Sequence, residues 1–276
     1  MAEPFFVLAR LCRRMLAGVL ASYSLRETTM RNAAIAVFAL SCAAFCAAQS
    51  GANWSYEGKT GPIAWGHLDP AYQTCAKGHE QSPIDIRGAK PNKALSPLAF
   101  HFITGTMTLE NTGRGIAVHV NPGSTLTVDD ARYELTEIDF HHPSEHAVKK
   151  HLSDMEADLV FRGGDGKTAI VAVRLNESNL PNALLATLWA HLPVSVGAKE
   201  KTTEMVNAGG LLPGDRSYWA YTGSELEPPC TEGVRWFVFA QQVSIGRSQW
   251  QAFTKLFRVN TRPAQDTHGR KIEASE

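Results

Sequence analysis

Two short stretches decide how this chain folds: DFHHPSEH at residues 139–146 and MEADLV at residues 155–160. Polar and apolar side chains alternate around both stretches, and successive side chains of a β-strand point to opposite faces. Each stretch therefore predicts an amphipathic strand whose polar side chains share one face. The polar faces of the two strands together carry Glu137, Asp139, His141, Glu156 and Asp158.

The connection between these two strands is short, at residues 143–153, so we expect them to pair as antiparallel neighbours. Pairing would collect the five polar side chains on one surface of a sheet. Two interpretations of that surface stay open. It is either a polar strand face wetted by solvent, or a metal or acid–base site.

The composition predicts a globular protein. The chain has 276 residues, of which 44% are hydrophobic and 20% are charged, enough to bury a full core. The formal net charge is zero and no basic patch stands out, so we expect no nucleic-acid partner.

The N-terminus has the pattern of an export signal. Small and apolar residues run through positions 33–48 after Arg31, and they end in residue types that a signal peptidase accepts. We assign residues 1–29 to an upstream extension, 30–48 to a signal peptide and 49–276 to the fold. The run is shorter than the about 20 residues that span a bilayer. We therefore expect an exported protein, periplasmic or secreted, without a stable membrane anchor.

Two cysteines, Cys75 and Cys230, remain once residues 1–48 are set aside. An even pair in an exported protein favours a disulfide bond, because the compartment is oxidising. Two buried free thiols are the alternative.

Short strand-like runs separated by turn signals fill the chain from Trp54 onward. They lie at residues 99–109, 115–120, 124–128, 133–141, 155–161, 168–175 and 234–241. Helical periodicity is confined to residues 182–191 and 248–257. The pattern predicts one mostly β domain with short helices at its periphery.

Five separated segments resemble the α-type carbonic anhydrases, including exported bacterial members. They are WSY at 54–56, QSPIDI at 81–86, PSEH at 143–146 with MEA at 155–157, PPCTEGVRW at 228–236, and NTRPAQ at 260–265. The resemblance implies a single domain around a large, mainly antiparallel central sheet. It also implies a Cys75–Cys230 disulfide, and reversible hydration of CO2 to bicarbonate on a zinc ion.

The positions that match the family's three zinc ligands are Asp139, His141 and Asp158. Three neutral imidazoles leave the zinc its full charge, which lowers the pKa of bound water to about 7. Two carboxylates would cancel that charge, and an aspartate reaches less far than a histidine. The substitutions predict weak or absent zinc binding and impaired CO2 hydration.

Other matching positions depart from the family as well. Leu226 stands where a threonine would orient the zinc-bound hydroxide toward Glu145, and Arg114 stands at the proton-shuttle position. A guanidinium stays protonated and cannot relay protons. Glu137 and Glu156 match residues that support the metal ligands from behind.

Three functions follow from this resemblance. The first is the family reaction on CO2 and bicarbonate, at reduced efficiency. The second is a non-catalytic, carbonic-anhydrase-related binding protein, whose protein partner the sequence does not name. The third is an altered site for a harder ion such as manganese or magnesium, because carboxylate oxygens suit those ions.

Overall fold

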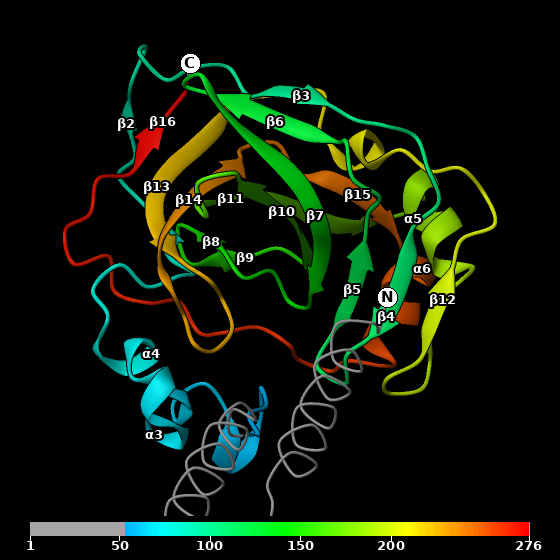
Figure 1. The fold of residues 1–276 in the computed structure, drawn as a ribbon, viewed down its shortest axis with the longest axis horizontal. Coiled ribbons are helices and arrows are strands. Elements are labelled where there is room, and N and C mark those ends of the chain that lie inside the picture. The colour runs from blue at the N-terminus through cyan, green and yellow to red at the C-terminus, as the bar shows by residue number, and fades with distance from the viewer. Residues whose placement is uncertain (1–52, 276) are drawn as a thin grey trace, which may run out of the picture. The chain divides into compact units, whose positions relative to one another are not determined.

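A computed structural model describes residues 53–275, and the upstream extension and signal peptide assigned to residues 1–48 lie outside this part. Within it, thirteen strands form one sheet, and three short strands form a second sheet in the order β1-β8-β9. The main path of the large sheet runs β12-β4-β5-β7-β10-β11-β14-β13-β16-β2, with β3, β6 and β15 paired beside it. Most pairs are antiparallel, as the sequence predicts (Figure 1).

The strands have the following bounds. They are β1 Asp85–Ile86, β2 Lys90–Pro91, β3 Ala99–His101, β4 Thr108–Asn111, β5 Ile116–His119, β6 Thr125–Val128, β7 Ala131–His141, β8 Ala147–Val148, β9 His151–Leu152, β10 Met155–Gly163, β11 Thr168–Ser178, β12 Lys199–Lys201, β13 Tyr218–Ser224, β14 Glu232–Phe239, β15 Val243–Gly246 and β16 Glu273–Ala274. The α-helices are α3 Trp65–Leu68, α4 Thr74–Lys77, α5 Ala183–Trp189 and α6 Arg247–Thr254, and the 3-10 turns are Gly58–Thr60, Pro70–Tyr72 and Ala208–Leu211.

Strands β7 and β10 pair antiparallel, as expected from the short connection between them. Their register places Asp158 opposite Asp139 and Glu156 opposite His141. The register shifts by one residue between Val160 and Phe161, and such a bulge changes which face the following side chains occupy. The polar residues of both strands therefore meet near the end of β7 where His141 lies.

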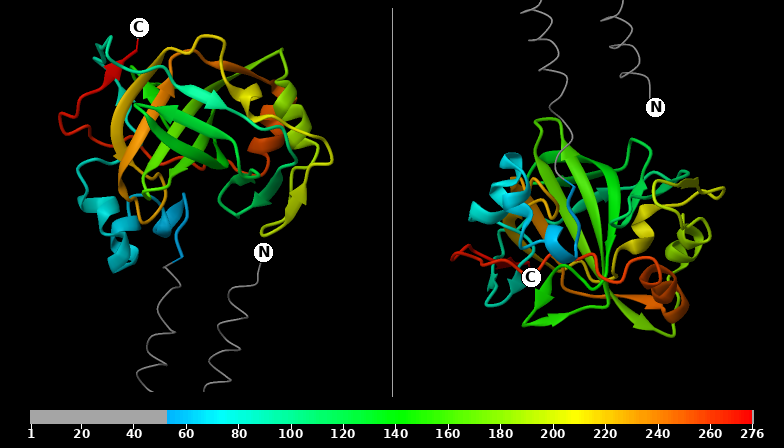
Figure 2. Two further views of the ribbon diagram at one scale, coloured as in Figure 1. Left: turned by 45° about the horizontal axis from the view of Figure 1, so that its top comes forward. Right: turned by 90° about the horizontal axis from the view of Figure 1, so that it is seen from below.

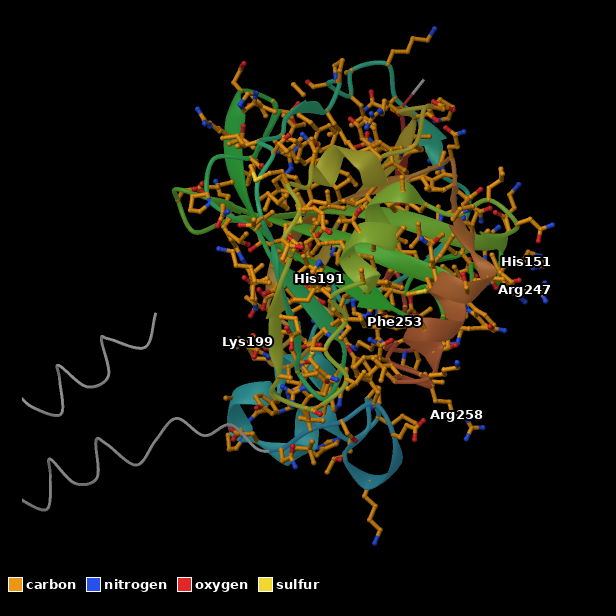
Figure 3. All side chains as sticks on the ribbon, turned by 90° about the vertical axis from the view of Figure 1, so that its right-hand side faces the viewer. His151, His191, Lys199, Arg247, Phe253 and Arg258 are labelled. Carbon is orange, nitrogen blue, oxygen red and sulfur yellow. A yellow bond between two sulfur atoms is a disulfide. The ribbon has the colours of Figure 1, made fainter. Side chains whose placement is uncertain are left out.

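The sheet separates two apolar clusters. On one face, alternate residues of β10 (Met155, Ala157, Leu159 and Phe161) join the main core, which α5 and α6 cover. Phe253 of α6, labelled in Figure 3, is fully buried. Its ring stacks on Trp189 of α5, with ring centroids 6.1 Å apart. The other face carries a smaller apolar cluster that includes Val160, Ile170 and Leu226, next to the polar residues of β7 and β10.

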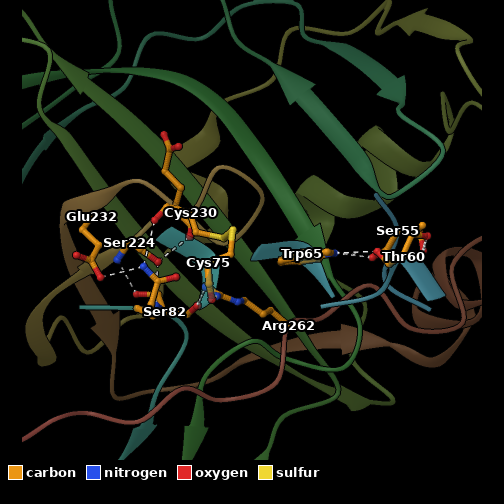
Figure 4. The surroundings of a disulfide bond; sticks show 11 residues. Ser55, Thr60, Trp65, Cys75, Ser82, Ser224, Cys230, Glu232 and Arg262 are labelled. Atoms are coloured by element: carbon orange, nitrogen blue, oxygen red, sulfur yellow. Dashed lines mark hydrogen bonds between the residues drawn. A yellow bond between two sulfur atoms is a disulfide. The ribbon is translucent and has the colours of Figure 1, made fainter. Parts of the chain in front are cut away.

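Cys75 of α4 and Cys230 form a disulfide bond (Figure 4), so the sequence prediction is confirmed. Arg262 lies beside the bond and donates to the carbonyl oxygens of Cys75 and Ser82, at 2.9 and 2.7 Å. The bond joins the N-terminal helices to the loop before β14. In Figures 1 and 2 these helices, α3 and α4, lie on the opposite side of the molecule from α5 and α6.

One predicted strand was wrong. Residues 99–109 form two strands, β3 and β4, because the chain changes partner: β3 pairs with β6, whereas β4 pairs with β5 and β12. Between them Gly105 makes a single bridge to Val206. The connection at 143–153 also contains two short strands, β8 and β9; β8 pairs with β9 on one side and with β1 on the other.

The two ends of the sheet path are short and polar. Strand β12 consists of Lys199, Glu200 and Lys201, all exposed, and β2 consists of the exposed residues Lys90 and Pro91. Each end strand is only two or three residues long.

Candidate functional site

An open pocket of about 200 Å³ lies on the polar face of β7 and β10, closed on one side by the loop after β13. Four of the residues singled out from β7 and β10 line it: Glu137, Asp139, His141 and Asp158. The remaining lining residues are Val160, Arg162, Ile170, Glu225, Leu226, Glu227 and Pro228. The structure thus brings the predicted polar surface together in one pocket, with Leu226 in its wall.

His141 lies at the floor of the pocket and is only 4% exposed. Its Nδ1 lies 2.9 Å from the carbonyl oxygen of Asn260 and 3.1 Å from Oε1 of Glu145. Its Nε2 lies 3.6 Å from Oδ2 of Asp158, which is beyond hydrogen-bond distance. Burial lowers the pKa of His141, but the charge and hydrogen bond of Glu145 outweigh it, and the pKa ends well above 6.5.

Asp158 is buried, with 1% of its surface exposed, and neither carboxylate oxygen has a hydrogen-bond partner. Burial raises the pKa of this carboxyl well above its usual value, and the charge of Glu156 adds to the effect. Asp139 is partly buried and shares a hydrogen bond with Glu137. Burial and the charges of Glu137 and Glu227 raise its pKa well above the usual range.

Glu145 is buried beneath His141. Its two oxygens accept from the backbone N–H of Arg262, at 3.2 and 3.1 Å, and one of them contacts His141. Burial raises the pKa of Glu145, and the charge of His141 offsets part of that effect. The carboxylate is therefore held in place from two sides.

Glu156 belongs to a buried chain of hydrogen bonds behind the pocket. It accepts from the backbone N–H and from Nδ1 of His146, at 3.0 and 2.6 Å. Nε2 of His146 contacts the hydroxyl of Tyr221 at 2.7 Å, and that hydroxyl contacts Ser82 at 2.9 Å. Burial raises the pKa of Glu156. The charge of His146 and its hydrogen bonds to the carboxylate lower the pKa by more, so the net shift is downward.

A cluster of charged side chains lies at the rim of the pocket; strand alternation allowed His119 to lie there but favoured a surface histidine, and gave no sign of its partners. His119 of β5 lies between two carboxylates: its Nδ1 is 3.0 Å from Glu137 and its Nε2 is 2.9 Å from Glu110. Lys199 of β12 contacts the same oxygen of Glu110 at 2.8 Å. These residues come from four different strands, and only the register of the sheet places them together.

Arg114 lies in an adjoining pocket of about 160 Å³, which also includes His119, Glu137 and Glu227. Its guanidinium carbon sits 4.1 Å from the centre of the Trp54 ring, a cation–π contact. Glu227, a residue that sequence reasoning missed, accepts a hydrogen bond from Tyr56 at 3.1 Å. The only signal for Glu227 was its place in the segment 223–230, next to Leu226.

Among the described residues, no group of three or more His, Cys, Asp or Glu side chains is arranged to hold a metal ion. His141 and Asp158 approach each other, but the Asp139 carboxyl is engaged with Glu137. From residue 53 to 275, no helix is long and apolar enough to cross a membrane.

Three comparisons with known proteins agree. Residues 60–276 match the model of the eukaryotic-type carbonic anhydrases. A carbonic anhydrase of Pectobacterium carotovorum is 36% identical over 221 residues, which cover 80% of this chain and 90% of that protein.

Solved structures give the same result. The α-carbonic anhydrase of Thermovibrio ammonificans, in complex with sulfanilamide, superposes with a TM-score of 0.79 at 34% identity and covers 82% of this chain and 100% of its own. A dioscorin in complex with ascorbate has a TM-score of 0.76 at 30% identity and covers 80% of this chain and 97% of its own. The chain therefore belongs to the α-type, or eukaryotic-type, carbonic anhydrase family.

Proposed function

We propose that this chain is an exported, carbonic-anhydrase-related protein that does not hydrate CO2 efficiently and that uses its pocket for binding. The observation that carries the proposal is the identity of the residues at the pocket floor. Asp139, His141 and Asp158 stand at the family's zinc-ligand positions, and two of the three are carboxylates. The export assignment rests on the Cys75–Cys230 bond, which is typical of oxidising compartments.

The residues present do not fit the zinc ion that the family normally uses. Two carboxylates would neutralise the metal's charge, so the metal would lower the pKa of a bound water molecule much less. In addition, no three His, Cys, Asp or Glu side chains between residues 53 and 275 are arranged to hold a metal ion. Any zinc should therefore bind weakly.

The surroundings of the pocket floor support the same proposal. Leu226 is 7% exposed and has no hydroxyl to orient a nucleophile toward Glu145, and Glu145 is already hydrogen-bonded to Arg262. Arg114 lies against Trp54 and cannot accept a proton at neutral pH. A relative, dioscorin, has been solved with ascorbate, which supports a binding role for a small organic molecule on this scaffold.

A second candidate is a site for a harder cation such as manganese or magnesium. The two unpartnered oxygens of Asp158 favour it, because these ions prefer carboxylate ligands. Metal titration separates this candidate from the first.

The test is metal analysis of mature protein purified without chelator, followed by stopped-flow CO2 hydration beside the Pectobacterium relative. We expect less than one zinc per chain after dialysis against a mild chelator, and hydration scarcely faster than buffer. Two variants control for adventitious metal: His141→Ala in the pocket and His151→Ala on the exposed strand β9. Zinc that survives the chelator, disappears only in His141→Ala and supports hydration at the relative's rate would overturn the proposal.

A further inference from the structure

The charges around the pocket are unbalanced. Of its acidic lining residues, Glu137 is paired with His119 at 3.0 Å and Glu225 with Arg162 at 2.9 Å. In the described part of the chain, no lysine or arginine forms an ion pair with the remaining three, which are Asp139, Asp158 and Glu227. The basic group nearest to Asp158 is His141, whose Nε2 lies 3.6 Å from Oδ2 of the aspartate. The pocket lining therefore has more acidic side chains (five) than basic ones (two, His141 and Arg162).

Among these acidic side chains, Asp158 indicates where a bound group would attach. Its side chain is 1% exposed and lines the pocket, and both of its oxygens lack any hydrogen-bond donor. Buried polar atoms in folded proteins are nearly always hydrogen-bonded, because an unpaired one has lost its water without compensation. The donor that Asp158 lacks has one open approach, which is through the pocket.

Part of the pocket lining is apolar. Val160, Ile170, Leu226 and Pro228 form it, and the first three belong to the buried apolar cluster on this face of the sheet. A volume of about 200 Å³ is smaller than the roughly 300–1,000 Å³ typical of sites for drug-sized ligands. The occupant must be small, with a donor-rich cationic end and a short apolar part.

We infer that this pocket binds a small primary alkylammonium ion, with its ammonium group on Asp158 and its alkyl chain against Leu226 and Ile170. An ammonium group carries three donors and no acceptor, and it forms hydrogen bonds in separate directions. A metal ion instead needs oxygens that converge on one point at about 2.0–2.6 Å, and no such group of three exists among residues 53–275. The inference rests on the proposed function, since a tightly bound zinc ion would occupy the same place.

The test is isothermal titration calorimetry of chelator-treated mature protein with n-butylammonium chloride. We expect saturable binding at one site per chain that weakens with salt, because the contact is ionic. n-Butanol, which has the same alkyl chain without the charge, should bind at least tenfold more weakly. Absence of saturable n-butylammonium binding, or equal binding of n-butanol, would overturn the inference.

Three variants locate the site. Asp158→Asn keeps the shape of the side chain and removes its charge, and it should weaken n-butylammonium binding at least tenfold. Glu227→Gln changes an exposed residue at the pocket mouth, so the variant should fold normally. It should weaken n-butylammonium binding severalfold. Asp130→Asn, in the exposed turn between β6 and β7, is the matched control and should leave affinity unchanged. Equal affinity in wild type, Asp158→Asn and Glu227→Gln would show that the ion binds elsewhere.

The inference and the proposed function fail in different ways. Zinc-dependent hydration at the rate of ordinary relatives would end the proposed function and, with it, the inference. Absence of both hydration and n-butylammonium binding would end the inference alone. Stoichiometric binding of manganese or magnesium that n-butylammonium does not displace would also overturn the inference.

Discussion

Asp139 and Asp158 are directly opposed partners across the antiparallel pair of β7 and β10. Like charges in opposed positions on neighbouring strands destabilise a sheet. Here the pKa of each carboxyl is raised, first by burial and then by nearby acidic groups, including Glu137 and Glu156. The opposed carboxyl groups at the pocket floor therefore destabilise the folded protein.

Asp158→Asn should stabilise the ligand-free protein by about 1 kcal/mol at pH 8, because it removes one of the two opposed charges. A carboxyl whose pKa is raised in the folded state favours folding most below its unfolded pKa, near 3.8. That contribution is lost as pH rises through the folded pKa. The advantage of the variant should therefore be larger at pH 8 than at pH 5. Urea unfolding at both pH values measures it, and a larger advantage at pH 5 would contradict the pKa direction.

Replacing Asp139 and Asp158 together by histidine should restore three imidazoles around His141 and allow zinc to bind. CO2 hydration should remain low, because Leu226 cannot orient a nucleophile. Adding Leu226→Thr should raise the rate, since one oriented hydrogen bond at a reacting oxygen is worth about 2.7–4 kcal/mol. Arg114→His should help only once proton transfer limits turnover. Stopped-flow hydration across the series tests this order, and a fast parent protein would show that the ligand positions are misassigned.

Cys75→Ser with Cys230→Ser should lower the free energy of unfolding by about 2–5 kcal/mol, because the bond closes a loop with a sequence separation of 155. Urea unfolding of wild type and double variant measures the loss. Thiol titration of denatured, unreduced mature protein should find no free thiol. Two thiols per chain would contradict the bond.

His146→Ala should destabilise the protein by about 3–5 kcal/mol, because it leaves Glu156 as a buried charge without its partner. Adding Glu156→Gln should recover part of the loss, since the uncompensated charge is then removed. Tyr221→Phe, which deletes only the hydroxyl at the far side of His146, should cost about 1 kcal/mol. Equal losses in the single His146→Ala and the double variant would argue against this charge pairing.

His119→Gln should cost about 0.5 kcal/mol at pH 6 and less at pH 9, a modest value because the side chain is 39% exposed. The hydrogen bond that His119 donates to Glu137 raises the pKa of His119, burial opposes this shift, and Glu110 adds to the increase. A raised histidine pKa stabilises the fold fully below the unfolded value of 6.5 and ceases to do so as pH rises through the folded pKa. A cost that grows toward pH 9 would contradict the ion pairs.

Alternation alone placed Asp139 and His141 on one face of β7 and Asp158 on the polar face of β10, because the side-chain period of a strand is fixed by its backbone. The short connection at 143–153 then predicted the antiparallel pairing of β7 and β10. Both inferences use only local sequence, and the structure confirms them.

Contacts that depend on register and on distant segments could not be read in the same way. His119 meets Glu137 only because β5 and β7 pair with a particular offset. The carbonyl oxygen of Asn260 reaches His141 from 119 positions away in the sequence. The split of residues 99–109 into two strands likewise follows from partners elsewhere in the sheet.

The polar strands at the two ends of the sheet path discourage association with other molecules. An open sheet edge presents unpaired N–H and C=O groups to which a strand of another molecule can add. Strand β12 places two lysines at one end, and β2 combines a lysine with a proline at the other. Charge makes a neighbouring strand costly to add, and proline has no N–H to offer it. Strands β12 and β2 therefore make both ends of the sheet path poor templates for a strand of another molecule.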